Sequence, residues 1–362
     1  MSATGRYIKY NLKSNLLPTL IFTIFGMAIV TITVPDQLTP YTDMNGDVVT
    51  AGTSASLGLL SATISILCTV IPLLNISPFK NKRNLDTLFA MPLDRGKMAI
   101  GTFVSGYIQV VIIYTAVFLL HISYLIFKTD WFSLGYLPLF YISSLASGFI
   151  VYSFFSFIIM KNNTIGDGTW VSIMWIGAIA VAILILVFYL RYVPAYYTVN
   201  NQGNIEAVKI GDLDIIFTML AIWSTPYSAV TSTNSIFVRL IENKKGGLFG
   251  IDTYDSIVST WYMFIVWLAV GILAAYGFFR TFADYRAYKA EDISTTWWGY
   301  KLLIPLYGYA ALSFITPTTI LAVFIFILMA VGYFIYRRSF KLKKSDIICL
   351  ILGIIPLAFS PY

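Results

Sequence analysis

Charged residues are scarce in this chain. They make up 11% of its 362 residues, whereas 58% of the residues are hydrophobic. Soluble domains carry about 25% charged residues, because most of their surface faces water. The shortage excludes an ordinary soluble domain and indicates that most of the chain lies in lipid.

The residue types that catalytic and metal sites use are also scarce. The chain has one histidine and two cysteines, too few for a clustered His/Cys metal site. Cys68 and Cys349 lie in apolar runs and are expected to be buried thiols. No G-x-x-x-x-G-K-[ST] phosphate loop occurs, so the chain is not expected to hydrolyse ATP by that loop. We therefore expect a chain that is not an enzyme and that has no catalytic, cofactor-binding or metal site.

The apolar runs contain no carboxylates. Ion-coupled transporters need ionisable groups at membrane depth, where each charge costs roughly 2.5–3.5 kcal/mol. His121 is the one titratable candidate in these runs. We interpret it as a neutral imidazole that shares a hydrogen bond with a neighbouring helix; a proton path or a substrate contact is the alternative. The driving force for any uphill transport is then expected to come from another chain.

Apolar stretches long enough to cross a bilayer recur along the sequence, since a spanning helix needs about 20 apolar residues. Six spans are predicted, at residues 16–34, 57–76, part of 98–127, 137–160, 168–190 and 257–279. The first has no small-residue cleavage site and is interpreted as a span, not as a signal peptide. The expected fold class is an all-α polytopic integral membrane protein.

Basic residues mark one side of the membrane. Most of the 24 Lys and Arg residues lie in alternate loops, whereas the loop 35–56 has none and carries three aspartates. This positive-inside pattern predicts a multi-pass plasma-membrane protein with a cytoplasmic N-terminus. Topology and attraction to anionic inner-leaflet lipid explain the net charge of +7, so no nucleic-acid partner is expected.

Three regions outside the spans have expected roles. Residues 1–15 are predicted to form a basic interfacial helix, with Tyr7, Ile8 and Leu12 as its apolar face. The loop 35–56 is expected to be irregular. Residues 191–255 are expected to be external and membrane-associated.

Within the external region, residues 215–241 are interpreted as two short helices on the outer leaflet, and a full span is the alternative. Its aromatic residues Tyr196, Tyr197, Trp223 and Tyr227 are candidates for an exit for an amphipathic substrate; interfacial packing is the alternative.

Residues 281–362 are expected to leave the membrane and return to it. A cytoplasmic helical extension is predicted to residue 301, followed by a helical hairpin at 302–336 that turns near 316–318. The C-terminal segment 346–360 is interpreted as a short span or a half-inserted helix.

The segment 78–97 is the most distinctive part of the chain. It lies between two apolar runs and contains five basic residues: Lys80, Lys82, Arg83, Arg95 and Lys97. Residues 84–91 are predicted to form a short helix that Asn84 caps, that Pro92 ends and whose apolar stripe is Leu85, Leu88 and Phe89. A short amphipathic helix at the inner surface is suited to docking a soluble partner; electrostatic anchoring to lipid is the alternative.

These features together resemble the permease subunits of ABC-2 type exporters, of the subgroup encoded beside GntR-type regulators. The closest match is RNLDTLFAMPLDRGK at 83–97, and YRAYKAE at 285–291 and RSFK at 338–341 resemble two further stretches of that subgroup. The resemblance covers essentially the whole chain. In one departure, Asp292-Ile293 stands where the subgroup tends to have small residues.

The resemblance implies a six-span permease core over residues 16–280, paired with a second permease chain and with cytoplasmic ABC ATP-binding subunits that hold ATP and Mg²⁺. It implies docking of the ATP-binding subunit on 78–97. Leu85, Leu88 and Phe89 would then enter a groove of that subunit, with Arg83, Asp86 and Arg95 setting the orientation by charge.

The resemblance also implies a substrate path lined mainly by the second and fifth spans, for an amphipathic peptide, drug or lipid-like molecule. The candidate residues for this path are Ser61, Ser65, Thr69, Trp175, Trp223 and Tyr227.

Two other functions stay open. One is a noncatalytic membrane scaffold or sensor subunit in a response to antibiotic stress. The other is a membrane-embedded transferase or hydrolase, which would need clustered acid–base groups; Asp212 and Asp214 are the nearest pair. The protein that co-purifies with the chain distinguishes these functions.

Overall fold

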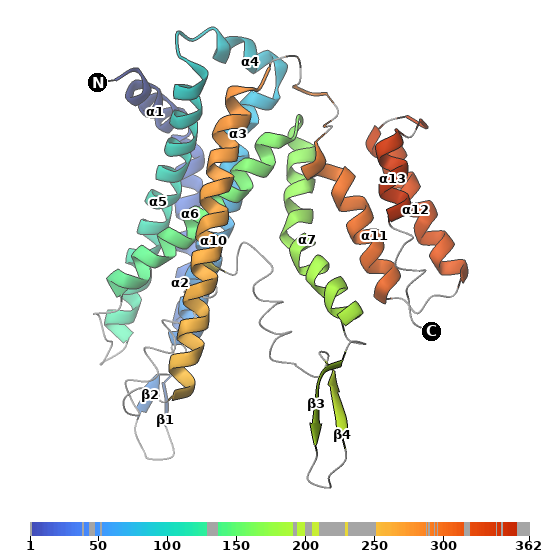
Figure 1. Ribbon diagram of the computed structural model, residues 1–362. Coiled ribbons are helices and arrows are strands. Elements are labelled where there is room, and N and C mark those ends of the chain that lie inside the picture. The colour runs from blue at the N-terminus through green and yellow to red at the C-terminus, as the bar shows by residue number, and fades with distance from the viewer. Residues whose placement is uncertain are drawn as a thin grey trace. The chain divides into compact units, whose positions relative to one another are not determined.

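A computed structural model gives the structure of the chain (Figure 1). The residues that it describes are 2–37, 40–42, 48–50, 53–128, 137–190, 194–199, 205–209, 229–230, 251–286, 288, 290–292, 294, 296–314, 319–337, 339–341 and 343–352. The chain divides into two compact units. Unit 1 is Met1–Met160 with Pro226–Ala290, and unit 2 is Lys161–Thr225 with Glu291–Tyr362.

Five helices within the described residues are long and apolar enough to cross a membrane. They comprise Leu16–Val34, Leu57–Lys80, Arg95–Phe127, Leu137–Lys161 and Phe264–Ala283. A predominantly helical chain with several membrane-length helices is thus confirmed, and the six-span permease core remains a prediction. Helix α7 (Ile165–Leu190) occupies the position of the predicted fifth span.

Unit 1 is organised around one long helix, α5 (Arg95–Lys128). With 34 residues, α5 is about 51 Å long, which exceeds the roughly 30 Å of a hydrocarbon core. It packs against α1 (Ala3–Ser14), α2 (Leu16–Gln37), α3 (Thr53–Ile76) and α10 (Ile251–Ala283). Hydrogen bonds also connect it to α6 (Leu137–Lys161). The unit further contains the 3₁₀ turn η1 (Ser77–Lys80) and α4 (Lys82–Phe89).

Helix α1 contacts α5 through polar side chains. The Tyr7 hydroxyl lies 3.3 Å from the Thr102 hydroxyl, and Asn11 Nδ2 donates to Ser105 Oγ at 2.6 Å. Of the predicted apolar face, Tyr7 is buried, but Ile8 and Leu12 are only half-buried. Tyr7 and Asn11 are four residues apart and lie on one helix face, and this face is hydrogen-bonded to α5.

Two short hairpins interrupt the helical pattern. Strands β1 (Pro40–Thr42) and β2 (Val48–Thr50) pair antiparallel inside the loop that was expected to be irregular. Strands β3 (Pro194–Val199) and β4 (Ile205–Lys209) pair antiparallel in the region that is predicted to be external, where Tyr, Thr and Val residues favour strands. Apart from Ala229 and Val230, the two helices predicted at 215–241 lie outside the described residues.

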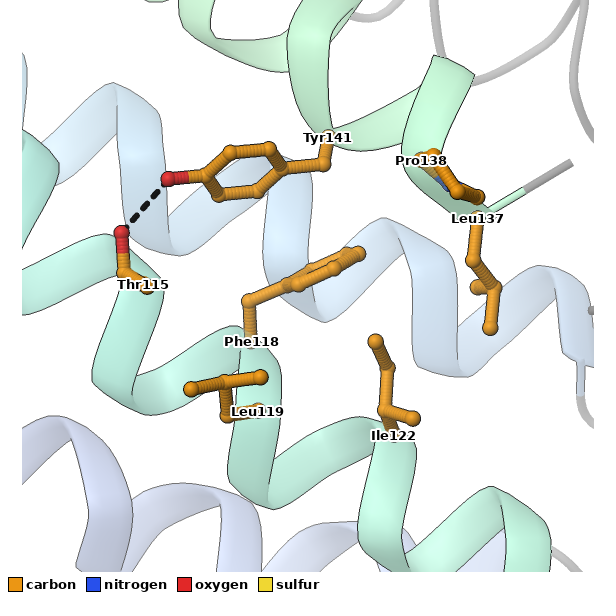
Figure 2. Close-up of a pocket in the computed structure, with 7 residues that line it drawn as sticks. All are labelled: Thr115, Phe118, Leu119, Ile122, Leu137, Pro138 and Tyr141. Atoms are coloured by element: carbon orange, nitrogen blue, oxygen red, sulfur yellow. Dashed lines mark hydrogen bonds between the residues drawn. The ribbon is translucent and has the colours of Figure 1, made fainter.

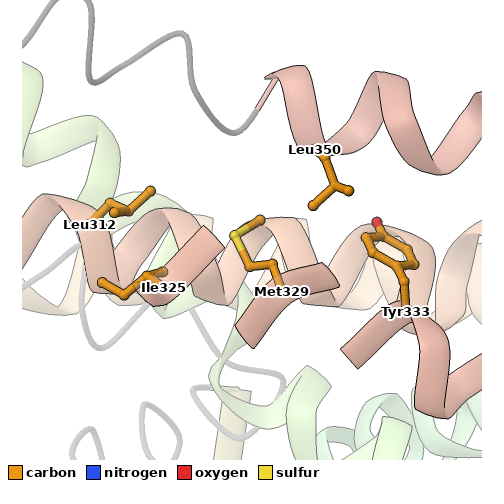
Figure 3. Packing of buried hydrophobic residues seen from close by; sticks show 5 residues of the cluster. All are labelled: Leu312, Ile325, Met329, Tyr333 and Leu350. Carbon is orange, nitrogen blue, oxygen red and sulfur yellow. The ribbon is translucent and has the colours of Figure 1, made fainter. Parts of the chain in front are cut away.

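Unit 2 contains α7 and a C-terminal group of helices. That group is the single turn η6 (Trp297–Lys301), α11 (Leu302–Phe314), α12 (Thr319–Arg337) and α13 (Lys344–Leu352). Helices α11 and α12 occupy the positions of the predicted hairpin, whose turn lies outside the described residues. Five buried side chains from α11, α12 and α13 form the core shown in Figure 3: Leu312, Ile325, Met329, Tyr333 and Leu350.

The helical extension predicted to residue 301 is wrong. Helix α10 ends at Ala283, and the described residues between Asp284 and Thr296 are not α-helical. Tyr285 gives its carbonyl to Arg95 at 2.9 Å instead of to a following helical turn. Glu291 has a positive φ of 63°, a conformation that a right-handed helix does not contain. The chain therefore turns soon after α10.

Candidate functional site

The segment between α3 and α5 contains the short helix α4, as the sequence predicts, but its boundaries differ. The helix begins at Lys82 because Asn81, not Asn84, caps it: Asn81 Oδ1 accepts the Arg83 N–H at 3.0 Å. It ends at Phe89, three residues before Pro92.

The apolar stripe of α4 faces its own chain. Leu85 is 0% exposed, and Leu88 and Phe89 are half-buried. The surface of Leu85 is therefore already covered within the chain, and its entry into a groove of a partner remains a prediction. The outward face of α4 carries Arg83 and Asp86, which are both exposed.

Arg95 is engaged within the chain. Its guanidinium lies 4.8 Å from the centre of the Phe89 ring, and Nη1 donates to the Tyr285 carbonyl at 2.9 Å. Two of the predicted coupling residues, Phe89 and Arg95, therefore stack on each other and connect the end of α4 to the chain that follows α10.

Lys80, on the other side of α4, contacts the same tyrosine. Its side chain is buried, Nζ donates to the Met160 carbonyl at 2.9 Å, and Nζ lies 4.3 Å from the centre of the Tyr285 ring. A buried ammonium needs such partners, since an uncompensated charge away from water is costly. Met160 is near the C-terminus of α6, where a cation is favoured by the helix dipole.

Lys80, Arg95 and Tyr285 together are named the Tyr285 clamp. The two cations flank α4 in the sequence, and both contact the residue that follows α10. Phe79 and Phe282 pack beside this clamp, edge to face, with ring centres 4.9 Å apart. In the sequence, Lys80 indicates topology alone, and the basic residues at both ends of α4 are the visible signal of this further role.

Three of the candidate path residues lie along one stripe of α3. Ser61, Ser65 and Thr69 are four residues apart, and each hydroxyl donates to the carbonyl one turn earlier, at 3.1, 2.8 and 2.8 Å. Ser61 is buried, and the other two are half-buried. The stripe offers small side chains, whose hydroxyl protons are used within the helix.

The fourth described candidate, Trp175, belongs to unit 2. It is 7% exposed, and its Nε1 donates to the Trp298 carbonyl at 2.7 Å, with the two rings 5.5 Å apart. This side chain is committed to packing inside its unit. The candidates Trp223 and Tyr227, and the side chains of Tyr196 and Tyr197, lie outside the described residues.

The environment of the His121 side chain differs from the one that the sequence predicts. The side chain is 0% exposed, and neither ring nitrogen has a hydrogen-bond partner among the described residues. The predicted hydrogen bond to a neighbouring helix is therefore absent from the part of the chain that the structure describes. The helix places this side chain inside unit 1.

A network of three amides connects helices of unit 1. Asn75 Nδ2 donates to Gln109 Oε1, and Asn15 Nδ2 donates to Asn75 Oδ1, each at 2.9 Å. Hydrogen bonds between helices stabilise packing in lipid, where the hydrophobic effect does not drive helices together. The visible signal of this network in the sequence is an amide side chain inside each of two apolar runs, Asn75 and Gln109.

An apolar pocket lies between α5 and α6 (Figure 2). Its volume is about 330 Å³, and its lining consists of Thr115, Phe118, Leu119, Ile122, Leu137, Pro138 and Tyr141. The two hydroxyls of the lining bond to each other at 2.6 Å. The pocket therefore suits an apolar group, because its lining has little polar surface.

Among the described residues, no three His, Cys, Asp or Glu side chains are placed to hold a metal ion. No protein-family model matches this sequence, and a search of curated proteins gives no match.

Proposed function

We propose that this chain is the membrane-spanning permease subunit of an ATP-driven ABC exporter, and that a separate cytoplasmic ATP-binding subunit drives it by docking on α4. The observation that carries the proposal is the geometry of α4. This short helix lies between two membrane-length helices, exposes charged residues and is tied at both flanks to the end of α10.

A docking helix must both meet its partner and pass movement to the spans. Arg83 and Asp86 are exposed on α4, and Leu85 anchors the helix to the chain beneath it. The Tyr285 clamp then connects the flanks of α4 to α10. A displacement of α4 is thus transmitted to α3, α5 and α10 together.

Charged side chains make up most of the proposed contact between α4 and the ATP-binding subunit. Because Leu85 is covered and the Phe89 ring lies under Arg95, the partner meets mainly the polar face around Arg83 and Asp86. Complementary charges steer association and fix the register of an interface. ATP and Mg²⁺ stay on the ATP-binding subunit, and a second permease chain, identical or related, completes the transporter.

The proposed cargo is amphipathic, such as a peptide, a drug or a lipid-like molecule. The predicted spans contain no carboxylate that could couple transport to an ion gradient. The half-buried hydroxyl residues Ser65 and Thr69 of α3 and the apolar pocket of Figure 2 offer polar and apolar surface of the kind that such molecules contact.

The test begins with the partner. The tagged full chain is purified with its binding protein, and that protein is examined for a phosphate-binding loop. The complex in nanodiscs is then assayed for ATP hydrolysis. Arg83→Glu should weaken the complex about tenfold, the equivalent of about 1.4 kcal/mol, and should lower the hydrolysis rate at a fixed partner concentration. Lys9→Glu, at an exposed basic residue of α1, is the matched charge-reversal control.

Equal affinity and equal hydrolysis for the Arg83→Glu and Lys9→Glu variants would refute docking on α4. Purification with a kinase in place of an ATP-binding transport subunit would favour the scaffold or sensor alternative and would refute the exporter.

A further inference from the structure

One end of the α11–α12 hairpin in unit 2 carries exposed aromatic and basic side chains. They are named the basic–aromatic rim: Trp297, Phe340, Lys341, Lys343 and Lys344. Helix α11 begins immediately after η6, and the rim lysines follow the end of α12. These segments lie together, because the Tyr333 hydroxyl donates to the Lys301 carbonyl at 3.0 Å and the Tyr300 and Tyr336 rings are 4.4 Å apart.

Both aromatic members of the rim are exposed. Phe340 is 89% exposed, and Trp297 is 58% exposed. Phe340 rests against Phe334 of α12, with ring centres 5.6 Å apart. Large exposed aromatic rings are expected at the depth of lipid headgroups, where part of the ring meets hydrocarbon and part meets water.

The positive charge of the rim is not compensated within the described residues. Lys341, Lys343 and Lys344 are exposed, and none of them forms an ion pair there. The nearby carboxylate, Asp346, is 0% exposed and is occupied by Arg337, whose Nη2 donates to Asp346 Oδ1 at 2.7 Å. Arg337 and Asp346 therefore form an ion pair with each other, and the three lysines of the rim remain available to an external anion.

An apolar surface adjoins this charge. Helix α12 exposes a row of large apolar side chains at Val323, Phe324, Ile327, Leu328, Val331 and Ile335. Helix α13 exposes Ile347, Ile348 and Ile351. Residues 315–318, which connect α11 and α12 at the other end, include no charged residue. The hairpin thus has a charged end and an uncharged end, as expected of an element that enters a membrane from one side.

We infer that the basic–aromatic rim binds the headgroups of anionic phospholipids at the membrane surface. Phe340 and Trp297 lie at headgroup depth, and the three lysines contact the phosphates. Each lysine near an anionic surface strengthens binding by about fivefold. This surface is independent of the docking face on α4, so either proposal can fail without the other.

The test uses the full chain in vesicles that contain brominated phosphatidylglycerol in phosphatidylcholine, or the reverse mixture. Phe340→Trp places a fluorescent reporter in the rim, and the emission that it adds relative to the wild type is quenched by brominated lipid nearby. At low salt, we expect phosphatidylglycerol to quench this emission more effectively than phosphatidylcholine does. The preference should fall at least about tenfold when the three rim lysines are replaced by glutamine, and it should weaken at high salt.

The matched control is Lys9→Gln with Lys13→Gln, two exposed lysines of α1 in the other unit, which should leave the preference at residue 340 unchanged. An unchanged thermal unfolding midpoint establishes that each variant is folded. The inference is overturned if both lipids quench equally at low salt, if neither lipid quenches, or if the control lowers the preference as much as the rim variant does.

Discussion

The Tyr285 clamp can be tested by a double-mutant cycle on Lys80 and Tyr285. Lys80→Met removes the ammonium but keeps a long apolar side chain, and Tyr285→Leu removes the ring. In the structure, Lys80 Nζ lies 4.3 Å from the ring centre, and the two residues are 2% and 4% exposed. A desolvated cation–π contact contributes about 2 kcal/mol, compared with about 0.5–1 kcal/mol at an exposed site. We expect a coupling energy of about 1–2 kcal/mol.

The cycle is necessary because neither single variant isolates this contact. Lys80→Met also removes the hydrogen bond to the Met160 carbonyl, worth about 1.5–3 kcal/mol when the donor is charged. It also removes the cost of burying an ammonium, which acts in the opposite direction. Both contributions cancel in the cycle, provided that the two sites affect each other only through their contact.

The free energies come from reversible unfolding of the full chain in mixed micelles with an increasing fraction of SDS, followed by tryptophan fluorescence. Tyr285→Phe is the matched control, because it keeps the ring and should keep the coupling. A coupling energy below about 0.3 kcal/mol, the usual limit of additivity, would refute the clamp. A Tyr285→Phe variant that loses the coupling as Tyr285→Leu does would show that the hydroxyl, and not the ring, carries it.

Two further predictions concern other contacts. A Cβ at Gly101 would collide with the Tyr7 ring, whereas one at Gly58 meets open space. Gly101→Ala should therefore destabilise the chain by about 1–3 kcal/mol and expose α1 to protease, and Gly58→Ala should do neither. Burial raises the pKa of Asp346, but hydrogen bonds from Arg337 and the Lys343 N–H outweigh it and hold the pKa below its ordinary value. The contribution of the Arg337–Asp346 ion pair to the free energy of unfolding is fully present above about pH 4. It is lost as the pH falls through the pKa of Asp346 in the folded state. Asp346→Asn should flatten this acid dependence in thermal unfolding measured from pH 3 to pH 6.

The membrane-length helices were the predictable part of the fold. Helices α2 and α3 follow the predicted ranges closely, because a run of about 20 apolar residues is a strong local signal. The boundaries of α4 were less certain because Asn81 and Asn84 can both cap a helix, and the choice depends on how the chain leaves η1. The end of α10 was missed, since the carbonyl of Tyr285 is taken by a residue far away in sequence.

At the candidate site, local sequence patterns do not predict which residues pack against each other. The apolar stripe of α4 predicts that the helix packs against something, but the same stripe suits the chain itself or a partner. Leu85 packs against the chain itself. Lys80 looked like one more basic loop residue, and its burial depends on Met160 and Tyr285, which no pattern within residues 78–97 can indicate. Contacts between residues so far apart in the sequence can be identified only from the folded structure.

The exposed face of α4 and the Tyr285 clamp consist of different residues, so the binding of the ATP-binding subunit can be tested separately from the transmission of its movement. Arg83 is exposed and takes no part in the Tyr285 clamp, whereas Lys80 is buried and cannot meet a partner directly. If the clamp transmits movement, Lys80→Met should leave the affinity for the ATP-binding subunit unchanged while lowering the hydrolysis that depends on transport. Arg83→Glu should lower both. A Lys80→Met variant with full coupled hydrolysis would mean that α4 acts through α3 and α5 alone, because these helices continue its chain on either side.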